Sequence, residues 1–228
     1  MQPIPAAAAV TLGALAGYVD AVAFSQLFGV FPANQSGNAI VLGISLGDPT
    51  TAAWRPAVAI VGFAVGIAGA VALQRAFAGR RPTLVLVLAE AVLLAAVALL
   101  VGDLGAVDQL LDGIRGALLL LAASFAMGVQ TEVIRAHAGV SLSTTYQTGV
   151  LVQIAERSTP GGHAADRPRA AGALVLLGGV LVGYVGGAAL GAALGRTAGW
   201  ALALPAVVLA ALATTERWWG ATGSPPPT

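Results

Sequence analysis

Three acidic residues lie inside long apolar stretches of the sequence: Asp20, Glu90 and Glu132. A carboxylate in hydrocarbon costs several kcal/mol on most scales, so such a side chain faces the interior of a helix bundle. In that position it commonly binds a cation or takes up and releases a proton. We therefore expect these three residues to be candidates for coupling a transport process to protons or cations.

Two of these carboxylates, Asp20 and Glu132, also have a structural alternative. Asp20, as a neutral acid hydrogen-bonded to Asn34 or Asn38, would be a clasp rather than a coupling group. Glu132 is followed three residues later by Arg135, and side chains at that spacing are neighbours on a helix that can form an ion pair. Glu90 has no acidic counterpart in the last apolar stretch, which favours a side chain that faces a cavity.

Two short apolar stretches open with amide and hydroxyl side chains. They run from about residue 36 to 47 (SGNAIVLGISLG) and from about residue 148 to 157 (TGVLVQIAER). Such side chains both donate and accept hydrogen bonds, which suits the recognition of a small polar solute. The residues expected to bind the substrate are Asn34, Gln35, Ser36, Asn38, Gln130, Gln147 and Thr148.

The composition identifies the surroundings of these residues as a membrane. Hydrophobic residues make up 57% of the 228 positions and charged residues only 9%, whereas a soluble domain carries about 25% charged residues. A net charge of +1 gives no indication of a nucleic-acid partner, and the absence of cysteine excludes disulfides and thiolate metal sites. The chain is predicted to be an all-α integral membrane protein, and no cofactor or metal is expected.

Six stretches are long and apolar enough to cross a bilayer, which takes about 20 helical residues. They are residues 6–28, 56–77, 82–102, 114–136, 170–194 and 199–217. The first has no basic residue ahead of it and is too long for the apolar part of a signal peptide, so we expect it to be retained. The proline-rich residues 220–228 are expected to be a disordered tail after a single transmembrane domain at 1–219.

The distribution of arginine predicts how these segments cross. Cytoplasmic loops collect basic residues. If both short stretches enter and leave on the same side, eight of the eleven arginines lie on one side and three on the other. If both crossed fully, the split would be six against five, which is no bias. The short stretches are therefore predicted to be re-entrant and both termini cytoplasmic, with interfacial helices on the membrane surface as the alternative.

The two halves of the chain resemble each other. Gly17-Tyr18-Val19-Asp20 matches Gly128-Val129-Gln130-Thr131, and Gln35-Ser36-Gly37 matches Gln147-Thr148-Gly149. Each half, at residues 6–103 and 114–219, is then one helix, a re-entrant element and two more helices. An odd number of crossings requires the second copy to insert upside down, and such inverted repeats are typical of secondary transporters.

In this arrangement the two short helices begin near the middle of the membrane. Asn34 and Ser36 are good N-cap residues for the first, and the second is expected to start near Thr145 or Thr148. Irregular backbone at that depth is tolerated only inside protein or against a water-filled cavity. Since helix N-termini carry free N–H groups and a positive dipole end, the cavity should suit an anionic or strongly hydrogen-bonding group.

Small residues recur every four positions in two of the long stretches. These glycine ladders are Gly179, Gly183, Gly187, Gly191 and Gly195 in one, and Gly62, Gly66 and Ala70 in the other. Ladders of this kind let helix backbones approach closely. We expect these two helices, which are equivalent in the two halves, either to pack on each other or to form the seam of a homodimer.

The motifs that match between the halves also carry a family resemblance. Gly17-Tyr18-Val19-Asp20-Ala21 and Asn34-Gln35-Ser36-Gly37-Asn38, with Met127-Gly128-Val129-Gln130 and Thr148-Gly149, are similar to the pattern of the YoaK family. That family comprises small bacterial membrane proteins of uncharacterised function and usually has Thr at the position of Ser36. The resemblance covers nearly the whole chain. It implies a six-helix protein of the bacterial inner membrane, but no substrate.

No enzyme signature is visible in the sequence. Its two histidines, His137 and His163, fall in predicted cytoplasmic loops, and no phosphate-binding loop or nucleophile–base pair is present. The function that best fits the residues is secondary transport of a small solute, with Asp20 as the leading coupling residue. A passive channel of the same fold, or a membrane assembly factor or sensor, are the alternatives. A titratable residue at an occluded site favours the transporter.

Overall fold

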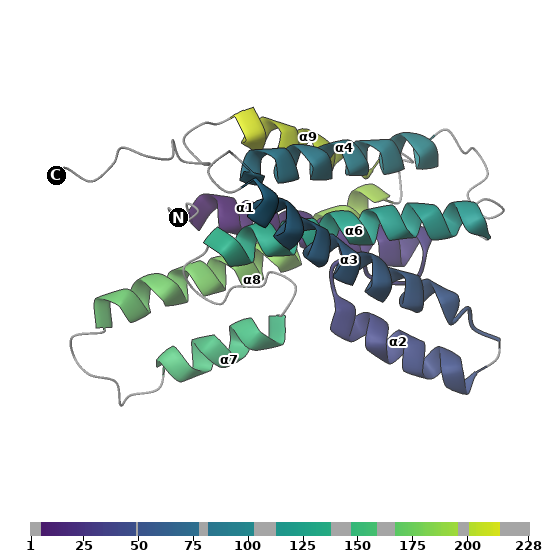
Figure 1. Cartoon of the computed structure of the whole chain (residues 1–228). Helices are drawn as coiled ribbons and strands as arrows, with labels where there is room; N and C mark the ends of the chain where they lie inside the picture. The colour runs from purple at the N-terminus through teal and green to yellow at the C-terminus, as the bar shows by residue number, and fades with distance from the viewer. Residues whose placement is uncertain are drawn as a thin grey trace.

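Helices form every regular element in the part of the chain that the computed structural model describes, which is residues 6–48, 50–77, 82–102, 113–137, 147–158, 167–195 and 201–214 (Figure 1). The first half contains α1 (Ala6–Val22), the π-helix η1 (Ala23–Leu27), α2 (Gln35–Gly47), α3 (Trp54–Ala76) and α4 (Pro82–Gly102). The second half contains α6 (Ile114–His137), α7 (Gln147–Ser158), α8 (Arg167–Gly195) and α9 (Ala203–Thr214). The expected disordered tail, residues 220–228, lies outside the described residues.

Within the described residues, five helical segments are long and apolar enough to cross a membrane. They are Ala6–Gln26, Trp54–Ala76, Thr83–Val101, Ile114–Arg135 and Ala171–Gly195. Large apolar side chains such as Val61, Val92 and Val182 are exposed on the outer faces of these helices. A helix that is apolar on its exposed as well as its buried face is typical of a membrane span. The chain is therefore a multi-pass, all-helical membrane protein, as its composition predicts.

The sixth predicted crossing stays a prediction. Residues 199–217 are expected to span the membrane, but the structure describes a helix of 12 residues there, α9. Because a crossing takes about 20 residues, α9 by itself is too short. Residues 199–200 and 215–217 lie outside the described part of the chain.

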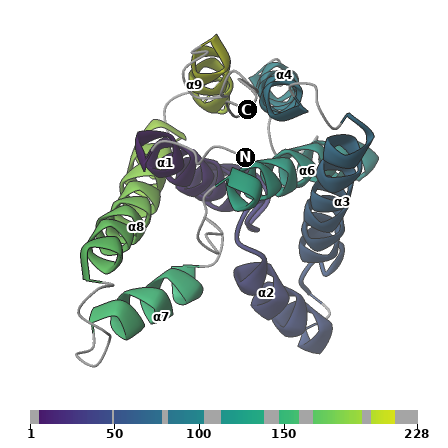
Figure 2. The same ribbon diagram turned by 60° about the vertical axis from the view of Figure 1, so that its left-hand side comes forward.

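The helices form two similar groups around a central pair (Figure 2). α1 and α6 lie in the middle and are the most buried of the five candidate spans. α8 packs along α1, and α3 packs along α6. α4 packs on α6 and α9, while the short helices α2 and α7 contact α3 and α8 respectively. Each half therefore contributes one central helix that is covered by a long helix of the other half.

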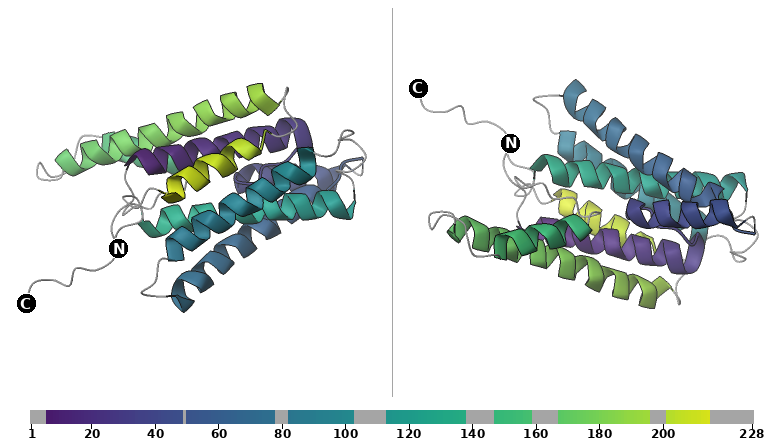
Figure 3. Two further views of the ribbon diagram at one scale, coloured as in Figure 1. Left: turned by 90° about the horizontal axis from the view of Figure 1, so that it is seen from above. Right: turned by 90° about the horizontal axis from the view of Figure 1, so that it is seen from below.

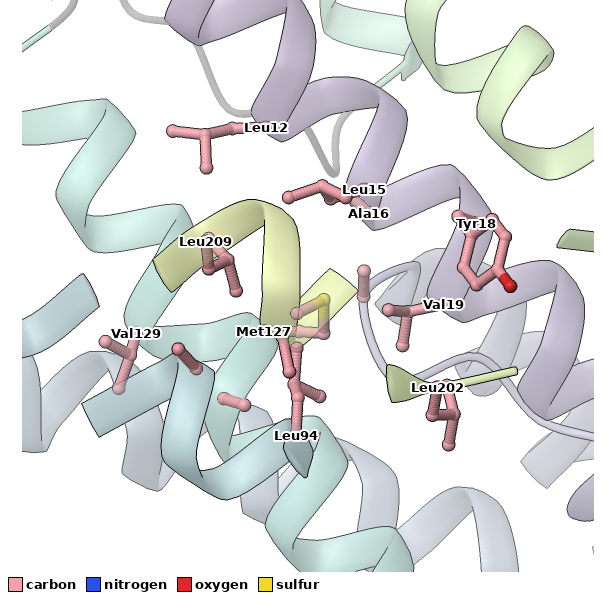
Figure 4. Packing of buried hydrophobic residues seen from close by; sticks show 14 of the residues in the cluster. Leu12, Leu15, Ala16, Tyr18, Val19, Leu94, Met127, Val129, Leu202 and Leu209 are labelled. Carbon is pink, nitrogen blue, oxygen red and sulfur yellow. The ribbon is translucent and has the colours of Figure 1, made fainter. Parts of the chain in front are cut away.

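The apolar core lies where α1, α4, α6 and α9 meet (Figure 4). Leu12, Leu15 and Val19 of α1 point into it, as do Leu94 of α4 and Met127 of α6. Lipid tails are as apolar as these side chains, so burial from water contributes little to holding the helices together. Close packing, small residues at the helix contacts and interhelical hydrogen bonds must do so instead.

The glycine ladders make these close contacts, but with other partners than we predict from the sequence. In each of the two interfaces, a glycine of one helix lies against the backbone of a residue on the other helix. Three residues after that contacted residue, the second helix has a glycine that lies against the backbone of the first helix. These contacts pair Gly187 with Ala14 and Gly17 with Tyr184 between α8 and α1, and Gly66 with Phe125 and Gly128 with Phe63 between α3 and α6. The expectation that α3 and α8 pack on each other is wrong, and their ladder faces are already covered within one chain. A homodimer therefore has no free ladder face to use as a seam.

The two short helices occupy opposite ends of the bundle. In Figures 1 and 3, α2 and α7 each begin near the middle of the bundle's length and run outward, α2 toward one end and α7 toward the other. The boundaries agree with the sequence expectation, since α2 starts at Gln35 and α7 at Gln147. α2 stops at Asp48, whose Oδ1 accepts hydrogen bonds from both the N–H and the hydroxyl of Thr50. These bonds hold the pKa of the Asp48 carboxyl below its ordinary value.

Candidate functional site

The candidate site begins where α1 widens into a π-turn, just after Asp20. η1 is closed by a hydrogen bond in which the Phe28 N–H donates to the Ala23 carbonyl over 2.7 Å. Such π-turns within α-helices are frequent at functional sites. From here the loop of residues 28–34 leads to the start of α2 and brings Ala33 back to Asp20.

The Asp20 carboxylate is buried, and both of its oxygens accept hydrogen bonds. Oδ1 accepts from the Ala33 N–H over 2.7 Å, and Oδ2 accepts from the Tyr184 hydroxyl of α8 over 2.6 Å. The Asn34 N–H is a further donor to the carboxylate. The side chains of Asn34 and Asn38, which the clasp alternative predicts as partners, bond to other groups. Asp20 therefore joins three elements: α1, the loop before α2, and α8.

Tyr184 is the site residue that the sequence reasoning missed. It lies in the middle of α8 between glycines of the ladder (GYVGG), where the backbones of α8 and α1 come close together. A buried tyrosine hydroxyl normally finds a hydrogen-bond partner. A tyrosine inside a glycine ladder within a membrane span was the signal available, because its hydroxyl can reach only a group on the neighbouring helix.

Asn34 caps the start of α2, as predicted. Its Oδ1 accepts from the Gly37 N–H over 3.3 Å and from the Ser36 hydroxyl over 2.8 Å. An N-cap side chain satisfies one of the backbone N–H groups that the first helical turn leaves free. The cap therefore uses hydrogen-bonding capacity of Asn34 and Ser36 that we assigned to the substrate, although Ser36 is exposed.

Asn38 and Gln35 hold the loop to the first turn of α2. Asn38 is completely buried, accepts from the Phe31 N–H over 2.8 Å, and donates to the Phe31 carbonyl and to Gln35 Oε1. Gln35 also donates to the Pro32 carbonyl over 2.9 Å. The structure thus brings four of the predicted binding residues together, and much of their polar surface organises the loop itself.

The Phe31 side chain completes this loop. Its ring stacks on that of Phe24, with centroids 4.5 Å apart and planes 6° from parallel. A Cβ at Gly37 would come within 2.8 Å of the Phe31 ring, so any larger residue would force the stacked ring to move. Gly37, which the sequence matches to Gly149 of the second half, is explained by this contact.

We predict that Asn38→Ala destabilises the protein and that Ser36→Ala does so much less. Asn38→Ala leaves the half-buried N–H and carbonyl of Phe31 without their partner, which costs about 1–3 kcal/mol for each group where water cannot replace it. Ser36 is exposed, and its hydroxyl makes one hydrogen bond, to Asn34. Thermal unfolding of the two variants in the same detergent measures the difference. Equal melting temperatures would show that the loop is not held by Asn38.

In the second half, the corresponding polar residues are arranged differently. Gln130 of α6 is buried and donates its Nε2 to the Leu12 carbonyl of α1 over 2.7 Å, which links the two central helices. Glu132 is buried and pairs with Arg135, whose guanidinium donates to both carboxylate oxygens over 2.7 and 2.9 Å. This confirms the ion pair predicted as the structural alternative. The backbone of Gln147 and Thr148 opens α7, and their side chains lie outside what the structure describes.

Glu90 of α4 differs from the other two carboxylates. Its side chain is 1% exposed, and neither of its oxygens has a hydrogen-bond partner among the described residues. A buried carboxylate without a partner is strongly disfavoured, because it loses its hydration and gains nothing in return. Of the three predicted coupling residues, Glu90 is therefore the one whose charge the described protein does not offset.

The comparison with protein families matches almost the whole of this architecture. A family model described as "Protein of unknown function (DUF1275)" matches residues 8–215. The chain belongs to the DUF1275 family. No curated protein and no solved structure matches it.

In this DUF1275 protein the matched segment runs from α1 to just beyond α9 and includes every candidate site residue. The narrower resemblance to the YoaK family stays a prediction. Chemically, the site offers one fully hydrogen-bonded carboxylate, one ion-paired carboxylate and one carboxyl that has no partner among the described residues. Such a set can hold helices together and, at the third, bind a proton or a cation.

Proposed function

We propose that this DUF1275 protein is a secondary transporter of a small solute in the bacterial inner membrane, coupled to protons or cations. The substrate site lies between the starts of α2 and α7, near the middle of the bilayer. Asn34, Gln35, Ser36, Gln147 and Thr148 are the proposed contacts, with Asn38 and Gln130 behind them. The proposal includes six crossings, with both short helices re-entrant.

The observation that carries this proposal is the course of α2 and α7. Both begin near the middle of the bundle and run to opposite ends (Figure 3). Half-helices whose N-termini meet at the midplane are the characteristic binding-site construction of several transporter folds. The loop before α2 is irregular backbone, which is tolerated at membrane depth only inside protein or beside a water-filled cavity.

An inverted repeat is supported by the way the two halves pack. In the contact of α1 with α8 and in that of α6 with α3, each helix has a glycine three residues after the residue that the partner helix's glycine meets. In Figure 2, α9, α1, α8 and α7 follow one another on one side as α4, α6, α3 and α2 do on the other. Transport by alternating access commonly uses such halves as bodies that rock against each other around a fixed site.

The position of Asp20 bears on the charge of the solute. Its carboxylate accepts backbone N–H groups immediately before α2, so a negative group of the protein already lies at the positive end of that helix. This weakens the preference for an anionic solute that two free N-termini would create. We therefore propose a small polar solute recognised by hydrogen bonds, and do not restrict it to anions.

The proposed orientation predicts the labelling of two single cysteines in a chain that has none of its own. Ala52 and Ser158 are exposed. Ala52 lies between α2 and α3 and Ser158 ends α7, and α2 and α7 run to opposite ends of the bundle (Figure 1). Ala52→Cys should react with a membrane-impermeant maleimide in spheroplasts, and Ser158→Cys should react only after the membrane is opened. The opposite pattern would invert the topology, and labelling of both in sealed spheroplasts would contradict the re-entrant course of the short helices.

An uptake screen in reconstituted vesicles tests the function. The purified protein should accumulate a small polar solute against its gradient when a proton or cation gradient is imposed, and empty vesicles should not. A passive channel would equilibrate the solute without accumulation. An assembly factor or sensor would move none, so the three functions give three different results.

A further inference from the structure

Glu90 is placed by the fold as a buried group in an apolar helix face. It lies on α4 in line with Leu86, Leu94 and Val97, all of which are buried. Asp20 has three hydrogen-bond donors, and Glu132 is paired with Arg135. Within the described helices, Glu90 alone among the predicted coupling residues has neither.

A second buried acceptor lies on the neighbouring helix. α4 and α6 pack together and run in opposite directions, and Leu94 of α4 points toward Met127 of α6 (Figures 1 and 4). Glu90 lies about one turn before Leu94 in α4, and Gln130 lies about one turn after Met127 in α6. Because the two helices are antiparallel, both steps lead toward the same end of the bundle. Gln130 Nε2 donates to the Leu12 carbonyl, whereas its Oε1 is buried without a partner in the described structure. The two helices thus present unpaired acceptors at the same level of the core.

We propose that Glu90 is the proton-binding site of this protein, and that in this conformation it is a neutral acid whose O–H donates to Gln130 Oε1. One proton turns the carboxylate from an acceptor into a group that also donates. Protonation of Glu90 therefore supplies a hydrogen-bond donor for Gln130 Oε1 and at the same time removes the buried negative charge. The resulting hydrogen bond would connect α4, α6 and, through Gln130 Nε2, α1.

A proton fits these groups better than a metal cation does. Hard cations such as Ca²⁺ and Mg²⁺ take about six or more oxygen ligands, and the helix carbonyls around Glu90 are used by the helices themselves. Among the described residues, no charged side chain is bonded to Glu90 in place of the proton. The titratable side chains on the elements that contact α4 are Arg115, Glu132, Arg135 and His137 on α6, Arg55 and Arg75 on α3, and none within the described residues of α9. Glu132 is paired with Arg135, and Arg55 donates to the Phe28 carbonyl.

The use of this proton rests on the proposed transport function. Glu90 would give its proton to water on one side of the membrane and take one from water on the other. Release breaks the hydrogen bond to Gln130 and leaves a carboxylate that must be hydrated, so the deprotonated form favours a conformation in which α4 separates from α6. Protonation favours the closed packing that is described here.

Infrared spectroscopy tests the protonation state without any substrate. Purified protein in lipid nanodiscs should show a carboxylic-acid C=O band at neutral pH. The band should be lost in Glu90→Gln and retained in Glu156→Gln, which removes an exposed carboxyl on α7. Gln130→Leu should keep the band but shift it to higher frequency, because the O–H loses its acceptor. A band that survives in Glu90→Gln overturns the assignment.

Stability and transport supply the remaining outcomes. Glu90→Gln replaces a neutral acid by a neutral amide, so it should fold with the thermal stability of the parent. Raising the pH should destabilise the parent protein, because the ionised form leaves a buried charge, and should not destabilise Glu90→Gln in the same way.

Proton-driven accumulation should be abolished in Glu90→Gln while solute exchange continues, and accumulation that persists overturns the coupling role. A parent protein that shows the band but no proton-driven uptake refutes the transport function and leaves the proton site standing.

Discussion

Replacing Gly187 by Leu should prevent α8 from packing on α1 and leave the protein unfolded or aggregated in detergent. A Cβ at this position would lie against the Ala14 backbone, including its carbonyl oxygen. Overpacking costs about 1–3 kcal/mol where neighbouring side chains can adjust. We expect a larger loss here, because the obstructing atoms belong to a helix backbone that can yield only if the two helices separate.

The adjacent glycine provides a matched control. Gly186 is exposed, and nothing lies within 4 Å of a Cβ built on it, so Gly186→Leu adds the same side chain to an open face of the same helix. Size-exclusion profiles and melting temperatures of the two variants should differ sharply, with Gly186→Leu close to the parent protein. Similar behaviour of both variants would show that the α1–α8 contact is not the one described.

The same reasoning separates what could be predicted about the fold from what could not. The short stretch expected at about 36–47 is α2 at Gln35–Gly47, because Asn34 provides an N-cap and apolar composition marks the helix. The ladder at Gly179–Gly195 shows that one face of α8 approaches another helix closely. It does not say which helix, since other helices also offer small residues: Gly13 and Gly17 lie four residues apart in α1, and Gly128 lies in α6. That α8 packs on α1 and α3 on α6 depends on the fit between the surfaces of both helices in each pair.

At the candidate site, local contacts were predictable and distant ones were not. The cap by Asn34 and the pair of Glu132 with Arg135 join residues three apart, where helix geometry alone determines the neighbours. The bond from Tyr184 to Asp20 joins residues 164 positions apart. Predicting it requires the packing register of α8 on α1, which is set by the glycines between them. Only with that register known does it follow that both carboxylate oxygens of Asp20 accept hydrogen bonds.

The Asp20 series should show a large loss of stability in one variant and a small loss in another. Asp20→Leu removes the acceptor from the Ala33 and Asn34 N–H groups and from the Tyr184 hydroxyl, all in a buried site. Each group left unsatisfied costs about 1–3 kcal/mol, so this variant should be severely destabilised or fail to assemble. Asp20→Asn keeps one oxygen for the N–H groups, and the Tyr184 hydroxyl can turn to accept from the new amide.

Asp20→Asn should therefore fold, and the comparison with Tyr184→Phe shows whether the two side chains act together. Contacting residues give stability changes that are not additive, so the double variant Asp20→Asn/Tyr184→Phe should lose less than the sum of the two single losses. If Glu90 carries the proton, Asp20→Asn should also keep gradient-driven accumulation in vesicles, since its carboxylate serves to join α1, the loop and α8. A folded Asp20→Asn protein that exchanges solute but no longer accumulates it would give the coupling role to Asp20 instead. Both oxygens of that carboxylate would then have to exchange partners during each cycle, and Tyr184→Phe would be expected to change the pH dependence of uptake.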